Sequence, residues 1–304
     1  MAADAAQQNL RNTLYGGVVP RVKYLVASYP TVVLLVLFAV PMTMLFVFSF
    51  YRNISGGYFE PAFTFENYVR FLTESLYVDR AIYTLRLSAV TAVISLVMGY
   101  PLAYYIVRVK NGLVRRLYLT VTVSTLWLTF IIRGYAWSTL LQEGGPVPRI
   151  AAALGLMAEP SGLVPGYWAL VVSMVYVFLP FMVLTLYTSL RNIDRELLEA
   201  SKNLGAGPLT TFRRVTLPLS ASGIASGTML VFVLSLGVYV LPRLLGSPPQ
   251  WTLAVLIGNQ VMLESNIPFA AALSIGLLIV VVILAVVGIR VAGIDPESYG
   301  GGIT

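Results

Sequence analysis

The sequence of 304 residues contains neither cysteine nor histidine. Disulfide bonds are therefore impossible, and zinc, haem and iron–sulfur centres that need Cys or His ligands are excluded. Cysteine nucleophiles and Ser-His-Asp triads are excluded for the same reason. Charge is also scarce, because only 11% of the residues are charged, whereas soluble domains carry about 25%. A soluble globular enzyme does not fit this composition.

What the sequence does contain is apolar residues, which make up 58% of the chain, and an excess of positive charge, +7 at pH 7. In a soluble protein that excess would suggest nucleic-acid binding. In a membrane protein it reflects Lys and Arg left on cytoplasmic loops. We therefore expect the lipid bilayer, and no nucleic acid, as the surroundings of this chain.

Long runs without charge indicate where the chain crosses the membrane. A helix of about 20 apolar residues spans the hydrocarbon core, and runs of this length do not resemble the alternating strands of a barrel. The sequence therefore predicts an all-α integral membrane protein. Its six predicted transmembrane helices cover residues 28–51, 84–107, 117–140, 166–190, 218–241 and 267–290.

The distribution of Lys and Arg predicts the orientation. Most of these residues lie before the first predicted helix and in the loops 108–116 and 191–214. Because cytoplasmic loops are enriched in Lys and Arg, both termini are expected in the cytoplasm. The predicted organisation is a cytoplasmic lead-in at 1–27, a transmembrane domain at 28–292 with a cytoplasmic loop at 191–218, and a short cytoplasmic tail at 293–304.

The loop between the fourth and fifth predicted helices has its own helical signal. Asn192 or Asp194 can cap a helix that ends at Gly205, a residue common after helix C-termini. Pro208 can then begin a new helical segment. One apolar stripe runs along the predicted helix through Ile193, Leu197, Ala200 and Leu204. Amphipathicity alone would be satisfied by an ordinary connector at the membrane surface.

A spacing motif in this loop is more specific. Glu199-Ala200-Ser201 is followed, at set intervals, by Gly205, Val215 and Leu217-Pro218. This pattern resembles the EAA loop of permease subunits in binding-protein-dependent ABC importers. Ser201 stands where that family often has alanine, and Val215 where it often has isoleucine.

The resemblance implies a type I ABC importer permease (MetI-like) fold in the cell (inner) membrane. It also implies three kinds of protein partner: a dimer of ABC ATPase subunits, a second homologous permease of the PotC type, and an extracytoplasmic substrate-binding protein. The EAA helix would be the coupling helix that docks on the ATPase. The residues expected to couple are Asp194, Leu197, Leu198, Glu199, Ala200, Ser201, Gly205, Leu217 and Pro218.

Other segments resemble PotB-type permeases of spermidine/putrescine importers more closely. They read FTFENY at 63–68, GYPLAY at 99–104, RGYAW at 133–137 and LPFMVLTLYTSL at 179–190. This resemblance implies transport of a small organic cation, with a polyamine as the leading substrate. Related permeases carry ferric iron, thiamine, phosphonates or amino-acid derivatives, and these substrates remain alternatives.

ATP itself is not expected on this chain. A P-loop needs a Gly-rich turn that ends in Gly-Lys-Ser/Thr, and none of the three lysines, Lys23, Lys110 and Lys202, follows a glycine. We therefore expect a non-catalytic subunit without a cofactor of its own. ATP and Mg²⁺ would bind to the partner ATPase.

The substrate pathway is less evident from the sequence. Arg133 is an intramembrane charge and thus a functional candidate. It could line the pathway or pair with an acid such as Glu143. Alternatively, it could snorkel toward the membrane surface or hydrogen-bond to backbone carbonyls freed near Gly134. Aromatic faces attract cations, although Tyr and Trp are also ordinary interfacial residues. The candidate pathway residues are Tyr100, Arg133, Tyr135, Trp137, Glu143, Tyr176, Tyr239 and Glu264.

Two other functional classes fit less well. A secondary transporter would typically show inverted repeats with broken helices or an acidic residue at mid-membrane. A membrane-embedded enzyme would need His, Cys or buried pairs of carboxylates for most of its chemistry. Neither set of features is evident in this sequence.

Overall fold

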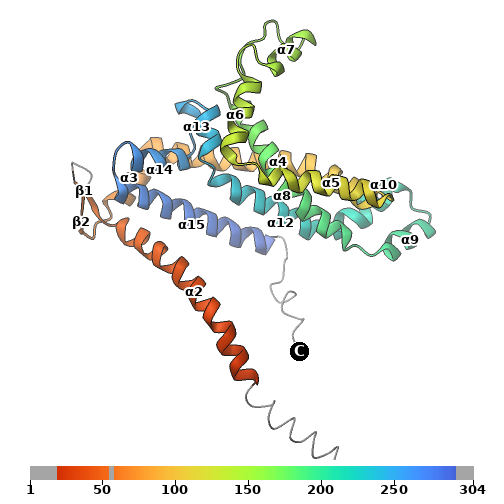
Figure 1. Cartoon of the computed structure of the whole chain (residues 1–304), viewed down its shortest axis with the longest axis horizontal. Coiled ribbons are helices and arrows are strands. Elements are labelled where there is room, and N and C mark those ends of the chain that lie inside the picture. Colours follow the sequence, from red (N-terminus) through yellow and green to blue (C-terminus); the bar gives the residue numbers. More distant parts are fainter. Residues whose placement is uncertain (1–18, 55–57, 292–304) are drawn as a thin grey trace, which may run out of the picture.

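The computed structural model describes residues 19–54 and 58–291 of the chain. Within these residues the protein is an assembly of long helices, with short helices and one hairpin between them (Figure 1). Most of the predicted lead-in and all of the predicted tail at 293–304 lie outside the described residues.

Three helices form the centre of the molecule. They are α4 (Ser75–Arg108), α8 (Tyr167–Arg191) and α12 (Ala221–Leu236), and each packs against the other two. Their shared core contains fully buried side chains such as Leu87, Met174 and Val231. Pro101 and Pro180 lie inside α4 and α8.

Close packing of α8 and α12 depends on glycine. A Cβ atom at Gly223 would lie 2.2 Å from Cβ of Ser189, and one at Gly227 would lie 3.0 Å from the sulfur of Met182. These two glycines are one helical turn apart and form the small-xxx-small pair that the sequence contains. The two positions therefore let α12 approach α8 closely.

A second cluster lies at one end of the bundle. It joins α3 (Glu66–Thr73), α14 (Leu253–Met262) and α15 (Ile267–Val291) to the start of α4. The buried side chains of this cluster are Tyr77, Leu253, Phe269 and Leu273. The first long helix, α2 (Val19–Phe48), contacts α15. Its C-terminal end lies near the bundle, and its N-terminal end lies away from the bundle (Figure 1).

A small hairpin departs from the all-helical expectation. Strands β1 (Arg52–Ile54) and β2 (Tyr58–Glu60) pair antiparallel directly after α2, with Asn53 opposite Phe59. The reason is an aromatic cluster, in which the ring of Phe59 lies 5.1 Å from that of Phe48 and 5.7 Å from that of Tyr51. These contacts fold the segment back on the end of α2.

The third predicted span is not one continuous helix. The segment 117–140 divides into α5 (Gly112–Ser124), the 3-10 turn η1 (Thr125–Trp127) and α6 (Phe130–Leu141), which is followed by α7 (Pro146–Ala153). The two halves meet at 99°. Thr129 supplies a reason for the break, because its hydroxyl accepts a hydrogen bond from the backbone N–H of Ile132 and caps a new helix.

The fifth predicted span also differs from the expectation. It begins with α10 (Pro208–Thr211), the π-helical turn η2 (Phe212–Thr216) and α11 (Leu217–Leu219), which together meet α12 at a 61° bend. It ends at Leu236, before the predicted residue 241, because Gly237 terminates α12. The chain then continues through α13 (Val240–Leu245) and the 3-10 turn η3 (Pro248–Gln250).

Length and composition identify the helices that can cross a membrane. Ser75–Arg108, Tyr167–Arg191 and Ile267–Gly288 pass as single helices, and the two bent pairs raise the number of candidate spans to five. In α2 the fully described apolar stretch is Val32–Phe48, and the sequence around it carries no charge from Tyr24 to Tyr51. A helical membrane fold is therefore confirmed, whereas six spans remain a prediction.

Candidate functional site: the loop between α8 and α12

The loop after α8 forms the predicted short helix. Helix α9 covers Arg195–Asn203, and Asp194 is its N-cap residue, although the Asp194 side chain makes no capping hydrogen bond. Glu196 lies in the first turn and Lys202 in the last, where the helix dipole favours an acid and a base respectively. The boundaries agree with the predicted helix within two residues at each end.

Gly205 ends α9 in the manner that the sequence predicts. Its φ of +83° lies in the left-handed region, where glycine is free of steric strain. Its N–H donates to the carbonyl of Lys202 at 2.9 Å, and the N–H of Ala206 donates to that of Ser201 at 3.1 Å. These two bonds form a Schellman motif, which satisfies carbonyls at the helix end.

A side-chain contact connects α9 with α10. The Ser201 hydroxyl donates to the carbonyl of Leu198 at 2.9 Å and lies 3.0 Å from the hydroxyl of Thr211. Thr211 is buried, whereas Ser201 is half-buried. The two short helices are therefore held together by a polar contact.

The apolar stripe of α9 is largely uncovered. Ile193 packs against the central core, but Leu197 is 47% exposed and Leu204 is 88% exposed. Leu209 on α10 is exposed as well. Within this chain, the stripe is thus covered only at Ile193, while Leu197 and Leu204 remain open to another molecule or to the membrane surface.

Glu199 and the end of the motif have few contacts within the chain. Glu199 is exposed, and no ion pair with Arg195 or Lys202 forms; the ion pairs between described side chains are Arg52–Glu66 and Arg70–Glu74. Leu198 is half-buried and Ala200 is exposed. Leu217 and Pro218 lie in α11 with exposed side chains. The motif therefore presents several side chains that the chain itself does not use.

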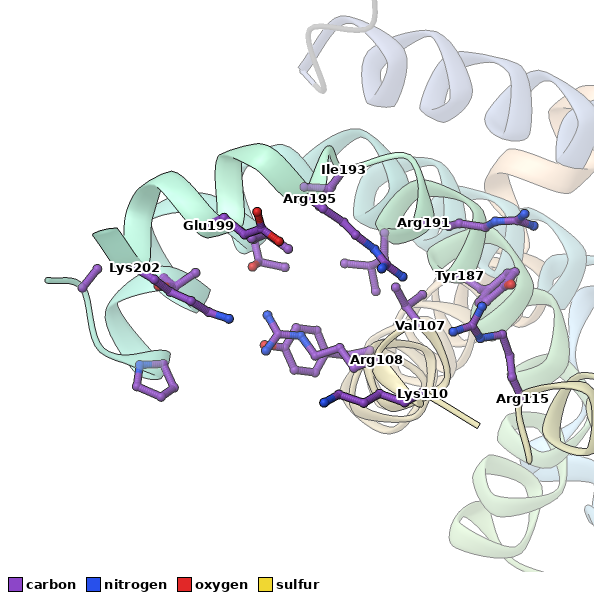
Figure 2. A pocket seen from close by; sticks show the side chains of 17 residues that line it. Val107, Arg108, Lys110, Arg115, Tyr187, Arg191, Ile193, Arg195, Glu199 and Lys202 are labelled. Atoms are coloured by element: carbon purple, nitrogen blue, oxygen red, sulfur yellow. The ribbon is translucent and has the colours of Figure 1, made fainter. Parts of the chain in front are cut away.

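One side of α9 borders a cavity of about 920 Å³ (Figure 2). Its other walls come from the C-terminal ends of α4 and α8, the start of α5, α10 and η2. Six Lys and Arg side chains and a single acid, Glu199, line it. From the sequence, these cations indicate only the orientation of the chain in the membrane. A signal was available, since the second and fourth predicted helices end on the same side of the membrane, so their terminal cations can meet.

The structure assigns partners to Arg133. Its side chain is only 5% exposed and donates to the backbone carbonyls of Thr125 and Val177. An ion pair with Glu143 does not form, and Glu143 is exposed. Of the alternatives that the sequence left open, hydrogen bonding to carbonyls is the one that the structure contains. Arg133 thereby joins η1, α6 and α8 at the break in the third predicted span.

The candidate aromatic residues do not form one group. Trp137 on α6 and Tyr176 on α8 are neighbours, with ring centroids 5.6 Å apart. Tyr100 is buried near the cavity end of α4, where its hydroxyl lies 2.9 Å from that of Ser220. Tyr135 is 61% exposed, and Tyr239 is half-buried with its ring against Gly258.

Glu264 is exposed, but its charge already acts on a neighbouring cation. Burial lowers the pKa of Arg70, yet the hydrogen bond with Glu74 and the charges of Tyr77, Glu74 and Glu264 outweigh that effect and raise this pKa above its ordinary value. Glu264 is the smallest of these contributions and forms no ion pair among the described residues.

Comparison with known proteins gives the family from the sequence. Residues 92–296 match the family model described as "Binding-protein-dependent transport system inner membrane component". The Escherichia coli spermidine/putrescine transport system permease protein PotB is 32% identical over 254 residues, which cover 83% of this chain and 92% of that protein.

Solved structures share the fold at lower identity. A bacterial ABC transporter involved in the import of the acidic polysaccharide alginate has a chain that matches with a TM-score of 0.76 and 18% identity, over 92% of this chain and 98% of its own length. A chain of the MetNI methionine ABC transporter matches with a TM-score of 0.56 and 21% identity, over 71% and 94%. The fold is therefore that of type I, MetI-like ABC importer permeases. The chain belongs to the family of binding-protein-dependent transport system inner membrane components, and it is a multi-pass, non-catalytic permease subunit of an ABC importer.

Proposed function

We propose that this permease conducts a polyamine such as spermidine or putrescine across the cell membrane. The observation that carries the proposal is the 32% identity with PotB, named as a spermidine/putrescine permease, over nearly the full length of both chains. The structural similarity to a chain of the alginate importer, with a TM-score of 0.76, is at 18% identity and therefore concerns the fold alone.

We further propose six membrane spans with both termini in the cytoplasm. The spans would be α2, α4, the broken pair α5–α6, α8, α10–α12 and α15. The concentration of Lys and Arg in the loops 108–116 and 191–214 favours this orientation. Because the chain has no cysteine, single Cys substitutions can test it. Asn111→Cys and Asn203→Cys should react with an impermeant maleimide only from the cytoplasm, and Thr73→Cys and Ser161→Cys only from outside.

The loop between α8 and α12 would transmit motion from the ATPase. Helix α9 connects to α8 through three residues and continues through α10 and α11 into α12, so a force on α9 reaches two central helices. The uncovered side chains of Leu197, Leu204 and Leu209 supply an apolar surface for docking. Glu199 is available to a cationic group of the partner.

The docking role can be tested with one charge in the apolar surface. Leu204→Asp should sharply reduce the amount of ATPase that co-purifies with the permease, because a carboxylate would be buried at the contact. Leu154→Asp is the matched control, since Leu154 is also strongly exposed but lies beyond α7, far along the chain from the loop. Equal ATPase recovery with both variants would contradict the assignment.

The complete importer would contain other chains. We propose a second, PotC-type permease, a dimer of ATPase subunits that hold ATP and Mg²⁺, and an external binding protein that delivers the substrate. Trp137, Tyr176 and Tyr239 would offer weak contacts to a cation along the pathway, with Tyr135, Glu143 and Glu264 near its outer end. Arg133 would support the helix break without touching the substrate.

Uptake by cells decides the substrate. A strain without its own polyamine importers should accumulate labelled spermidine when this permease and the chains encoded beside it are expressed. Competition by unlabelled spermidine and putrescine, but not by thiamine, ferric complexes or phosphonates, would support the proposal. Transport of one of these other compounds alone would overturn the substrate and leave the family membership intact.

A further inference from the structure

The cavity beside α9 gathers positive charge from separate parts of the chain. It lies where α4 and α8 both end, and Figure 2 shows the side chains of Arg108 and Lys202 directed into the same opening from α4 and α9. The Lys and Arg residues that line it are Arg108, Lys110, Arg115, Arg191, Arg195 and Lys202.

These cations are not neutralised by the described part of the chain. Glu199 is the single acid in the cavity wall and forms no ion pair with them. Arg115 is held by a hydrogen bond of 2.6 Å from Nη2 to the carbonyl of Val109, yet its buried Nε has no hydrogen-bond partner among the described residues. An unsatisfied buried donor on a charged group is costly. The Nε atoms of Arg80 and Arg133, which do not line this cavity, are unpartnered in the same way, so the case for an anion depends on the grouping of the cations and not on Arg115 Nε alone.

The side chain of Arg108 is held in place in the cavity wall by aromatic contacts. The guanidinium of Arg108 lies 4.2 Å from the centre of the Tyr104 ring, a cation–π distance. Tyr104 is in turn fixed by Phe212 of η2, with ring centroids 5.4 Å apart. One cation of the cavity is thus positioned by two aromatic side chains from different elements.

Ordinary causes explain only part of the cluster. Arg108, Arg191 and Lys202 lie in the last turns of α4, α8 and α9, where the helix dipole favours a cation. Loops enriched in Lys and Arg are also expected in a membrane protein. Neither cause requires Lys110 and Arg195 to line the same cavity as Arg115, because like charges repel one another.

We propose that this cavity binds a phosphate-bearing anion. Phosphate oxygens accept several hydrogen bonds at once, and Arg matches them with paired donors. The cavity also lies at the ends of two apolar helices, which is the level of lipid headgroups, where basic pockets between membrane helices bind anionic lipids. The same chemistry could come from a phospholipid headgroup or from a soluble phosphate compound. The proposal goes beyond the transport function and does not depend on which substrate is carried.

The test uses the purified full-length chain in a neutral detergent and follows its thermal unfolding. Dioleoylphosphatidylglycerol and inorganic pyrophosphate are the two probes, and dioleoylphosphatidylcholine is the neutral-lipid control. Ligand that binds only the folded state raises the midpoint in a saturable way. We expect such a rise with one or both phosphate probes. A rise with phosphatidylglycerol alone identifies a lipid site, and a rise with pyrophosphate alone identifies a site for soluble anions.

Two matched pairs of substitutions locate the effect. Arg108→Gln with Lys202→Gln should raise the half-saturating probe concentration roughly thirtyfold for two lost charges. Arg213→Gln with Arg214→Gln is the control, because these exposed cations lie in the same loop but do not line the cavity. If the first pair does not fold, Lys110→Gln with Arg195→Gln replaces it, since both side chains are exposed.

Three outcomes would overturn the proposal. The first is the absence of a saturable rise with either probe. The second is an equal loss of binding in the cavity pair and the control pair, which would indicate general charge attraction. The third is unchanged probe binding by the cavity pair together with loss of co-purifying ATPase, which would assign these cations to contact with that protein.

Discussion

The central bundle and the loop beside it both depend on glycine, but for opposite reasons. Gly223 in α12 is needed because another helix lies too close for any side chain, with Ser189 in the way of a Cβ atom. Gly205 after α9 has no atom within 4 Å of where its Cβ would be, and is needed because φ is +83°. The bundle is shaped by its own packing. The loop is shaped by its backbone, and its apolar side chains are left for another molecule.

The largest effect is expected where the bundle is tightest. Gly223→Ala should lower the free energy of unfolding by about 3 kcal/mol, at the upper end of overpacking effects, because the new methyl group would overlap the Ser189 side chain. Denaturation of the purified protein in detergent measures this change. Adding Ser189→Gly to the variant should restore most of the loss, since the next atom, Cα of Ser189, is 3.8 Å away. A double variant no more stable than Gly223→Ala would refute this explanation.

A somewhat smaller effect is expected at the break between α5 and α6. Arg133→Gln should lower the free energy of unfolding by about 2 kcal/mol, because the carbonyls of Thr125 and Val177 lose a charged hydrogen-bond donor. Glu143→Gln is the control and should stay within about 0.5 kcal/mol of the wild type, as exposed substitutions usually do. Equal losses in the two variants would instead support an ion pair between Arg133 and Glu143.

The break between α5 and α6 is a feature that the sequence could not predict. The segment 117–132 carries no charged residue, and this charge-free run continues through the 99° bend. Hydrophobicity indicates that a segment prefers lipid or the protein core, but it does not indicate the direction of the helix axis. The partners of Arg133 include the carbonyl of Val177, a residue of another helix. A contact of that kind leaves no pattern in a single sequence.

The loop was far more predictable, because its signals are local. The start of α9 near Asp194, its end at Gly205 and the new helix at Pro208 are predicted from capping and turn preferences of single residues, although the Asp194 side chain makes no capping hydrogen bond. Local signals do not say what a surface faces. The exposure of Leu204 and the convergence of Arg108 with Lys202 depend on how α4, α8 and α9 meet in space.

In the loop, a change of backbone preference should affect transport more than stability. Gly205→Ala forces a side chain into the left-handed region and should cost about 1 kcal/mol. Gly205→Asn should cost less, because asparagine tolerates this conformation better than other residues. Stability comes from denaturation in detergent, and coupling from substrate-stimulated ATP hydrolysis by the reconstituted importer. Loss of ATP hydrolysis should follow the strain, with alanine more impaired than asparagine; the reverse order would contradict a role for the turn.

The smallest effect is expected at the contact between α9 and α10. Ser201→Ala should lower the free energy of unfolding by about 1 kcal/mol or less, because the buried Thr211 hydroxyl loses its neighbour at 3.0 Å. Thr211→Val removes that hydroxyl, so adding Ser201→Ala to it should cost almost nothing further. This non-additivity, measured as a double-mutant cycle in detergent, isolates the contact from other effects of the two substitutions. Additive losses would mean that the hydroxyls do not interact, and that α9 and α10 are joined by the backbone turn at Gly205 alone.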